Sequence, residues 1–210
     1  MPLLNRLVFY LFFFFAIFFI VTLNIRPFPY VHIIKVVPVS SLALLVFIEV
    51  PGVRGCLIGM GLVFSGLGDV LLELDRTRYF IYGLTAFLVA HLFYISAFFR
   101  KAQFHFPRSF IALGILVYSA VMEYMLFPRL GEMLIPVTAY LCVITAMGLS
   151  ATIGTTNSYM VILGACLFIL SDSIIAINRF LIPIPFSSLW IMIVYYSAQV
   201  LIATGSLNHE

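Results

Sequence analysis

The sequence predicts an all-α, polytopic membrane protein with about eight transmembrane helices. Of its 210 residues, 64% are apolar and only 9% are charged, and the mean hydropathy is +1.19. A water-soluble domain is far less hydrophobic. The apolar runs approach the ~20 residues that a helix needs to cross a bilayer, and the alternating segments of a transmembrane barrel are absent. We therefore expect an integral multi-pass protein, in the endoplasmic reticulum if the source is an animal and in the inner membrane if it is a bacterium.

Turn and charge signals divide a single transmembrane domain, residues 1–210, into eight spans. The first follows Arg6 and runs into Asn24 without a small-residue cleavage site, so we interpret it as a span and not as a cleaved leader. Pro51 and Gly52 follow the second span, and a charged turn that begins at Asp75 closes the third. The predicted spans cover residues 7–23, 30–47, 56–74, 79–99, 109–127, 133–152, 160–177 and 189–207.

Charge gives little information about orientation or partners. The 11 Lys and Arg residues, with Lys35 left out because it lies inside a span, divide evenly between the two membrane faces, so the positive-inside rule does not choose an orientation. The cluster Arg100, Lys101 and Arg108 favours a cytoplasmic N-terminus. A formal net charge of +3 provides no basic patch of the kind that nucleic acid requires, so we expect no nucleic-acid partner.

Two stretches, Gly61–Asp75 and Gly164–Asn178, read as one element used twice. They align with an offset of 103 residues, which pairs Asp69 with Asp172. Because they are the third and seventh spans, a repeat of four spans preserves orientation across the membrane and predicts two similar four-helix halves. Chance recurrence of glycine and aspartate near helix ends is the alternative.

Each of these stretches carries an aspartate inside an apolar run, where an unpaired charge is costly enough to require a partner or a function. Asp69, Asp172 and Lys35 each lie about five residues, or ~8 Å at the helical rise, inside the same membrane face. His91, near the middle of the fourth span, is placed to form the floor of a shared cavity. We therefore expect Asp69, Asp172 and His91 to carry chemistry.

Further polar residues follow the helical period. Gly61, Ser65, Asp69 and Glu73 recur every four residues and predict one inward-facing stripe. In the eighth span Tyr195, Tyr196 and Gln199 add hydrogen-bonding groups within about one turn. Two carboxylates in a poorly solvated site, with Lys35 or Arg179 nearby, can take different protonation states and so supply an acid and a base together.

Each candidate also has a purely structural interpretation. The two aspartates with Lys35 would form a buried salt-bridge cluster that fixes helix packing. His91 would be a packing residue, and Glu73 would be a solvated acid at a helix end. Arg179 would extend to the lipid head groups or complement a helix C-terminus, and the paired tyrosines would belong to an aromatic belt.

In this order along the chain, the polar residues resemble the lysoplasmalogenase family of multi-pass membrane hydrolases, the YhhN-like proteins. The residues that carry the resemblance are Lys35 with Pro38, Gly68-Asp69, His91 with Tyr94, Ser171-Asp172 with Asn178 and Phe180, and Tyr195-Tyr196 with Ala198-Gln199. The resemblance implies cleavage of the vinyl-ether bond of lysoplasmalogens to a fatty aldehyde and glycerophospho-ethanolamine or glycerophospho-choline. The expected partners are thus a lysophospholipid substrate and the lipid bilayer. The oligomeric state is left open.

This chemistry agrees with the polar residues. A vinyl ether is cleaved by protonation of its outer alkene carbon, and water then captures the oxocarbenium ion, so one acid, one stabilising carboxylate and a base for water suffice, with no metal or organic cofactor. We expect one aspartate to donate the proton, the other to stabilise the cation and activate water, and His91 to orient or relay a proton. Which aspartate has which role stays open. The expected substrate contacts are Lys35, Glu73, Tyr94, Asn178, Arg179, Tyr195 and Gln199, with Lys35 and Arg179 suited to the phosphate.

Two other functions use the same residues. A transporter or proton-coupled carrier would also have repeated halves and intramembrane acids. A metal-dependent lipid hydrolase would use Asp69, His91 and Asp172 as ligands, although the sequence has no paired-ligand motif of the H-x-x-x-H type.

Overall fold

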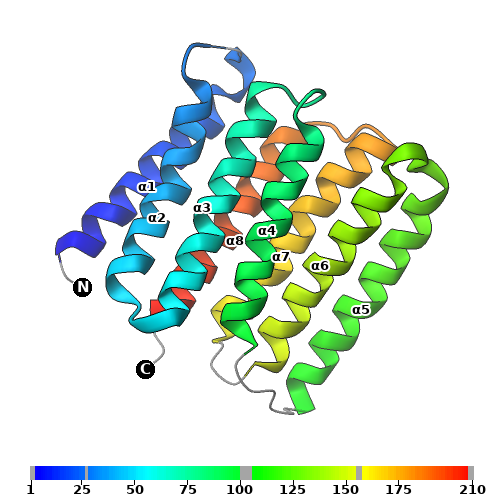
Figure 1. The fold of residues 1–210 in the computed structure, drawn as a ribbon. Coiled ribbons are helices and arrows are strands. Elements are labelled where there is room, and N and C mark those ends of the chain that lie inside the picture. Colours follow the sequence, from blue (N-terminus) through cyan, green and yellow to red (C-terminus); the bar gives the residue numbers. More distant parts are fainter. Residues whose placement is uncertain (1–2, 27, 100–105, 155–157, 208–210) are drawn as a thin grey trace. The chain divides into compact units, whose positions relative to one another are not determined.

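The computed structural model describes residues 3–26, 28–99, 106–154 and 158–207, and its long elements are all helices (Figure 1). Eight helices in these ranges are long and apolar enough to cross a membrane, which confirms the predicted all-α, polytopic membrane fold. Arg100 and Lys101, on which the predicted orientation depends, lie outside the described residues. The chain divides into two compact units, residues 1–97 and 98–210.

Unit 1 is built from α1 (Leu3–Val21), the short 3₁₀ helix η1 (Thr22–Ile25), α2 (Val31–Glu49), α3 (Gly52–Leu74) and α4 (Phe80–Phe98). Within it, α2 packs against both α1 and α3 (Figure 1). Large apolar side chains on these helices are fully buried and form the unit's core: Phe19, Leu42, Leu45, Ile58 and Leu62. Because lipid is as apolar as these side chains, close packing holds such helices together more than the hydrophobic effect does.

Glycines let α3 approach its neighbours closely. The space where Gly61 lacks a side chain is filled by the ring of Tyr94 on α4, and the corresponding space at Gly68 is filled by the ring of Phe87. Small residues at helix contacts are typical of membrane bundles. The predicted stripe on α3 does face inward, because Gly61, Ser65 and Asp69 are all buried.

The charged turn after α3 is closed by Asp75. Its Oδ1 accepts hydrogen bonds from the backbone N–H groups of Thr77 at 2.8 Å and Arg78 at 2.9 Å. The bonds from Arg78 and then from Thr77 lower the pKa of this exposed carboxyl from its ordinary value, because they favour the ionised form. Asp75 therefore fixes the short connection between α3 and α4.

Within residues 106–154 and 158–207, unit 2 contains four long helices and three short ones. They are α5 (Phe106–Leu126), η2 (Phe127–Arg129), η3 (Gly131–Met133), α6 (Leu134–Ile153), α7 (Tyr159–Ala176), η4 (Ile177–Leu181) and α8 (Ser187–Leu207). Helix α6 packs against α5 and α7, and α7 packs closely against α8. At Gly164 on α7, an added Cβ would lie only 2.9 Å from the backbone oxygen of Ala198 on α8. This contact requires glycine.

The seventh span does not end at residue 177 as predicted. It continues through η4, a π-helical turn in which the N–H of Ile182 donates to the carbonyl of Ile177 at 3.0 Å. The chain then becomes extended at Ile182, and Pro183 and Pro185 lack the N–H groups needed to continue a helix. The widened turn at η4 lies at the same end of unit 2 as the end of α5, and the two elements are in contact.

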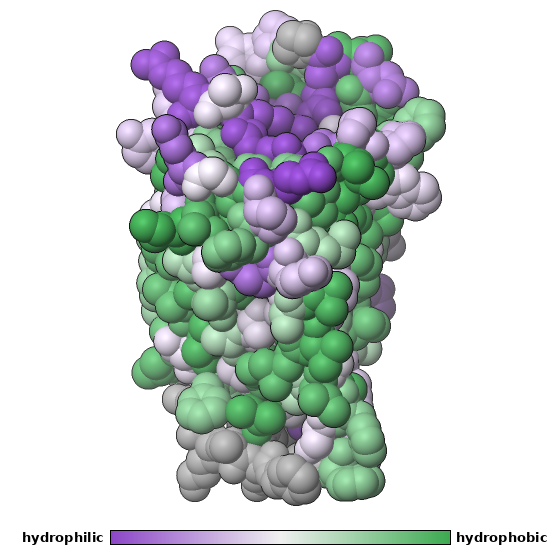
Figure 2. Space-filling model, turned by 90° about the vertical axis from the view of Figure 1, so that its right-hand side faces the viewer, coloured by the Kyte–Doolittle hydropathy of each residue, from purple (hydrophilic) through white to green (hydrophobic). Residues whose placement is uncertain are grey.

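The surface agrees with a location in the membrane. Figure 2 shows one face on which hydrophobic side chains cover most of the flank and hydrophilic ones gather at one end. Helix α5 alone exposes a series of large apolar side chains: Phe110, Leu113, Leu116, Val117, Val121 and Met125. A broad apolar flank is the surface that the hydrocarbon of a bilayer stabilises. The chain is an integral multi-pass membrane protein.

Candidate functional site

Unit 1 contains a buried cluster of charged side chains centred on Lys35. Its Nζ lies 3.3 Å from Oδ1 of Asp69 and 3.3 Å from Oε2 of Glu73, and it also donates to the backbone oxygen of Asp69 at 3.4 Å. The side chains of Lys35, Asp69 and Glu73 are only 4%, 5% and 7% exposed. The structure therefore brings together three of the predicted site residues, as their shared depth predicted for Lys35 and Asp69.

The local fold explains this arrangement. Asp69 and Glu73 are four residues apart on α3, so their side chains lie on one face of the helix. That face packs against α2, which carries Lys35 one turn after its start. The Lys35 ammonium thus forms ion pairs with two carboxylates, in an environment where an unpaired charge would be very unfavourable. Glu73 is therefore buried and ion-paired, and the alternative interpretation of this residue as a solvated acid at a helix end is wrong.

Arg26, which the sequence analysis did not single out, completes the cluster. Its Nη1 donates to Oε1 of Glu73 at 2.6 Å, and its guanidinium lies 5.4 Å from the centre of the Phe19 ring. Arg76, which follows α3, also interacts electrostatically with Glu73 and Arg26, so three cations surround the two acids Asp69 and Glu73. The signal was present in the sequence, because Arg26 follows the first span and Glu73 ends the third, so both lie at one face of the membrane.

His91 and Tyr94 occupy the buried face of α4. Both side chains are fully buried, and their ring centroids are 6.4 Å apart. On α3, the fully buried hydroxyl of Ser65 lies one turn before Asp69, and its Oγ has no hydrogen-bond partner among the residues that the structure describes. An unsatisfied hydroxyl beside the charged cluster leaves one hydrogen bond for a ligand or a water molecule.

In unit 2, Asp172 on α7 accepts a hydrogen bond from the phenol of Tyr140 on α6. The two side chains line a cavity of about 40 Å³ whose other walls are Ser173 and apolar residues of α5, α6 and α7. This volume suffices for an ordered water molecule, which would have the carboxylate and the phenol as polar partners. Tyr140 was not singled out from the sequence, because its role depends on the packing of α6 against α7, which places its hydroxyl on Asp172.

The two aspartates occur in corresponding settings. In each unit the aspartate lies on the third long helix and contacts a polar side chain of the second, which is Lys35 for Asp69 and Tyr140 for Asp172. The partners differ in charge, since one is an ammonium and the other a neutral phenol. The predicted meeting of both aspartates in one cavity involves both units and stays a prediction.

The remaining candidates lie on α7, η4 and α8. Tyr195, Tyr196 and Gln199 are buried on α8, and Tyr195 packs edge-on against Phe168 of α7 with centroids 5.4 Å apart. Asn178 accepts from the N–H of Ile184 at 2.9 Å and so holds the loop after η4. Arg179 is exposed on η4.

Two further observations concern acids and metals. Glu123, an acid inside α5 that the sequence analysis did not single out, accepts a hydrogen bond from Oγ1 of Thr138 at 2.7 Å. Within the described ranges, no group of three or more His, Cys, Asp or Glu side chains is placed to hold a metal ion.

Comparison with known proteins identifies the family. The YhhN family profile matches residues 30–206. The proteins named Lysoplasmalogenase TMEM86A of Bos taurus and Homo sapiens are each 35% identical to the chain over 159 residues, which is 71% of this chain and 64% of the relative. Lysoplasmalogenase of Mycobacterium bovis is 34% identical over 69% of this chain and 58% of its own length. Lysoplasmalogenase TMEM86B of Homo sapiens is 34% identical over 84% and 75%.

The match spans less than two thirds of the length of the TMEM86A and mycobacterial relatives. No solved structure matches the chain significantly. The range matched by the family profile nevertheless covers most of the chain and includes the positions of Lys35, Asp69, His91 and Asp172. This chain belongs to the YhhN family.

Proposed function

We propose that this chain is a membrane-embedded hydrolase that cleaves the vinyl-ether bond of lysoplasmalogens, releasing a fatty aldehyde and glycerophospho-ethanolamine or glycerophospho-choline. Its relatives in the family are named lysoplasmalogenases. The observation that carries the proposal is the pair of intramembrane aspartates with partners of different charge. A vinyl ether needs one acid and one anion, and these two settings can supply them.

The reaction begins when a carboxylic acid transfers its proton to the outer alkene carbon. The alkene electrons form the new C–H bond, and the carbon attached to oxygen becomes an oxocarbenium ion. A water oxygen bonds to that carbon and loses a proton to a base, which gives a hemiacetal. The hemiacetal then breaks its bond to the glycerol oxygen, which leaves with a proton as the alcohol, while the former alkene becomes the aldehyde. One water molecule is consumed, and no redox partner is needed.

In this proposal Asp69 is the anion. Lys35 at 3.3 Å favours the ionised carboxylate, which can stabilise the oxocarbenium ion and accept a proton from water. Glu73, which Arg26 holds through a second ion pair, helps to keep Lys35 in position. The unpartnered hydroxyl of Ser65 one turn away supports a ligand or water at this place.

Asp172 is the proposed proton donor. The hydrogen bond that its Oδ2 accepts comes from the phenol of Tyr140 and not from a cation, and the small cavity beside the pair is lined mostly by apolar residues. His91 orients water or relays a proton, and Tyr94, Tyr195 and Gln199 are expected to contact the substrate.

The head-group phosphate is better suited to an exposed cation than to Lys35. Lys35 lies between two carboxylates and its side chain is 4% exposed, whereas Arg129 on η2 and Arg179 on η4 are both at the surface and either can meet the phosphate. Asn178, which holds the following loop, would act by keeping that turn in place.

The test is turnover of lysoplasmenyl and ester lysophospholipids by purified protein in detergent micelles, with aldehyde and free fatty acid measured separately. Aldehyde from the vinyl ether alone is the expected result. Asp69→Asn and Asp172→Asn should each lose about 100-fold or more, the usual contribution of a general acid or base. Glu49→Gln, which removes an exposed acid at the end of α2, should retain activity. Wild-type turnover by either folded Asn variant would contradict the mechanism.

The same assay separates the other two functions. Micelles have no compartments, so a carrier would release no aldehyde. A metal-dependent hydrolase would lose its activity after thorough chelation and dialysis, whereas the proposed carboxylate mechanism predicts full activity.

A further inference from the structure

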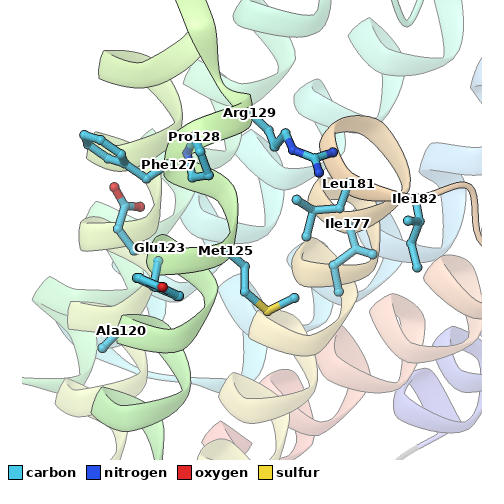
Figure 3. Close-up of a pocket in the computed structure, with 10 residues that line it drawn as sticks. Ala120, Glu123, Met125, Phe127, Pro128, Arg129, Ile177, Leu181 and Ile182 are labelled. Carbon is cyan, nitrogen blue, oxygen red and sulfur yellow. The ribbon is translucent and has the colours of Figure 1, made fainter.

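Unit 2 contains a large groove that the proposed mechanism does not use. It has a volume of about 1140 Å³ and lies between the end of α5, with η2, and the π-helical turn η4 (Figure 3). We call it the lateral groove, and its lining residues are Ala120, Glu123, Tyr124, Met125, Phe127, Pro128, Arg129, Ile177, Leu181 and Ile182. Its volume slightly exceeds the range of roughly 300–1,000 Å³ that is usual for small-molecule sites.

The groove combines apolar walls with one cationic side chain. Met125, Ile177 and Leu181 supply apolar walls, and Figure 3 shows Arg129 reaching from the end of α5 toward η4 above them. No carboxylate in the described ranges forms an ion pair with Arg129. Glu123 lies elsewhere on the wall and is engaged by Thr138 of α6. A single cation above an apolar trough is complementary to an amphiphile that carries a phosphate at one end.

The groove adjoins the cavity of Asp172. Met122 and Leu126 line that cavity, whereas Met125 and Phe127 line the groove, so the last turns of α5 form a wall of both. On the other side Ala176 borders the Asp172 cavity and the next residue, Ile177, borders the groove. The helix changes from α to π at this boundary, a feature often found at functional sites.

We propose that the lateral groove binds one lysophospholipid, with its phosphate on Arg129 and its single hydrocarbon chain along Met125, Ile177 and Leu181. This rests on the proposed function for the identity of the lipid. In a lysoplasmalogen only the glycerol unit separates the phosphate from the vinyl ether, so a phosphate on Arg129 places the ether in the groove, whose α5 wall also borders the Asp172 cavity. The exposed side chains Tyr124, Met125 and Ile182 leave the groove open to lipid along its side.

Binding is tested without turnover. The probe is a saturated alkyl lysophosphoethanolamine, which lacks the vinyl ether, with a photoreactive diazirine in its chain. After irradiation in micelles, labelled peptides should map to residues 120–129 and 177–182. Met125→Trp, which fills the groove, should reduce labelling at least about tenfold. Leu113→Trp replaces another exposed apolar residue of the same helix and should not.

A second pair of variants tests the phosphate contact. Arg129→Gln should raise KM for lysoplasmalogen about tenfold with kcat retained, because the lost contact is present in both the ground and transition states. Arg6→Gln, which removes an exposed cation of α1, should leave both constants unchanged.

The results of these experiments test lipid binding in the groove separately from the proposed hydrolase activity. Labelling of other helices, labelling unaffected by Met125→Trp, or equal labelling of these segments by a two-chain phospholipid probe would overturn the groove proposal even if aldehyde is released. Specific labelling of the groove without any aldehyde release would support the groove and refute the proposed function.

Discussion

Replacing Lys35 with methionine would show how strongly the charged cluster of unit 1 depends on its central ammonium. At 3.3 Å each ion pair with Asp69 or Glu73 has a gross Coulomb attraction of about 5 kcal/mol at an effective dielectric constant of 20, before the cost of desolvation. Lys35→Met leaves both carboxylates in place. Arg26 still pairs with Glu73, but Asp69 loses its cation.

Breaking a buried pair by removing one partner typically costs about 3 to 5 kcal/mol, because the other charge is left uncompensated. For a chain of this length, 1 kcal/mol corresponds to about 2 to 4 °C in Tm. We therefore expect Lys35→Met to lower Tm by roughly 6 to 20 °C. The double variant Lys35→Met/Asp69→Asn removes the uncompensated charge and should regain at least half of that loss.

The measurement is thermal unfolding in detergent, followed by circular dichroism at the helical band. Lys35→Arg keeps the positive charge and should lose less than Lys35→Met, and Arg6→Gln is the control for loss of a surface cation. A Lys35→Met variant that unfolds within about 2 °C of the wild type would refute a strong dependence on this ammonium. A double variant whose loss in Tm equals the sum of the two single losses would also refute it, since paired charges must be coupled.

Three further predictions concern other parts of the fold. Tyr140→Phe removes the hydroxyl that donates to Asp172, so aldehyde release should fall about tenfold or more with Tm little changed. Wild-type turnover by this variant would exclude a role for the contact in the reaction. Gly164→Ala places a methyl group against the backbone of α8 and should lower Tm, whereas Gly114→Ala, with open space around it, should leave Tm equal or higher. Asp75 has a lowered pKa in the folded state, so its contribution to stability is present above the unfolded pKa and is lost as pH falls through the folded value. The Tm difference between wild type and Asp75→Ala should therefore be constant near neutral pH and shrink below pH ~4, and a constant difference down to pH 2 would refute this origin.

Hydropathy alone was sufficient to predict the eight helices, because a membrane requires long apolar segments with internally satisfied backbones. It did not locate the end of the seventh span. Asn178 and Arg179 are polar enough to suggest a loop, yet the chain keeps helical hydrogen bonding for one widened turn and stops only before Pro183. The π-helical turn has no periodicity that a hydropathy pattern could reveal.

The cost of charge in lipid and the shared depth of two residues predicted that Lys35 and Asp69 lie close together, and the ion pair confirms it. The same arguments apply to Arg26 and Glu123, which were not singled out. Arg26 was assigned to a loop although its long side chain reaches Glu73. Tyr140 could not be found by an argument from charge, because only the packing of α6 against α7 places its hydroxyl on Asp172.

The ion pair between α2 and α3 also bears on how the chain enters the membrane. A lysine or aspartate costs about 2.5 to 3.5 kcal/mol at the centre of an inserting helix and less near its end, so each helix alone carries a penalty that the other removes. The two helices are joined by only Val50 and Pro51. We expect this hairpin to leave the insertion machinery as one unit, with the charges already paired before either helix meets lipid.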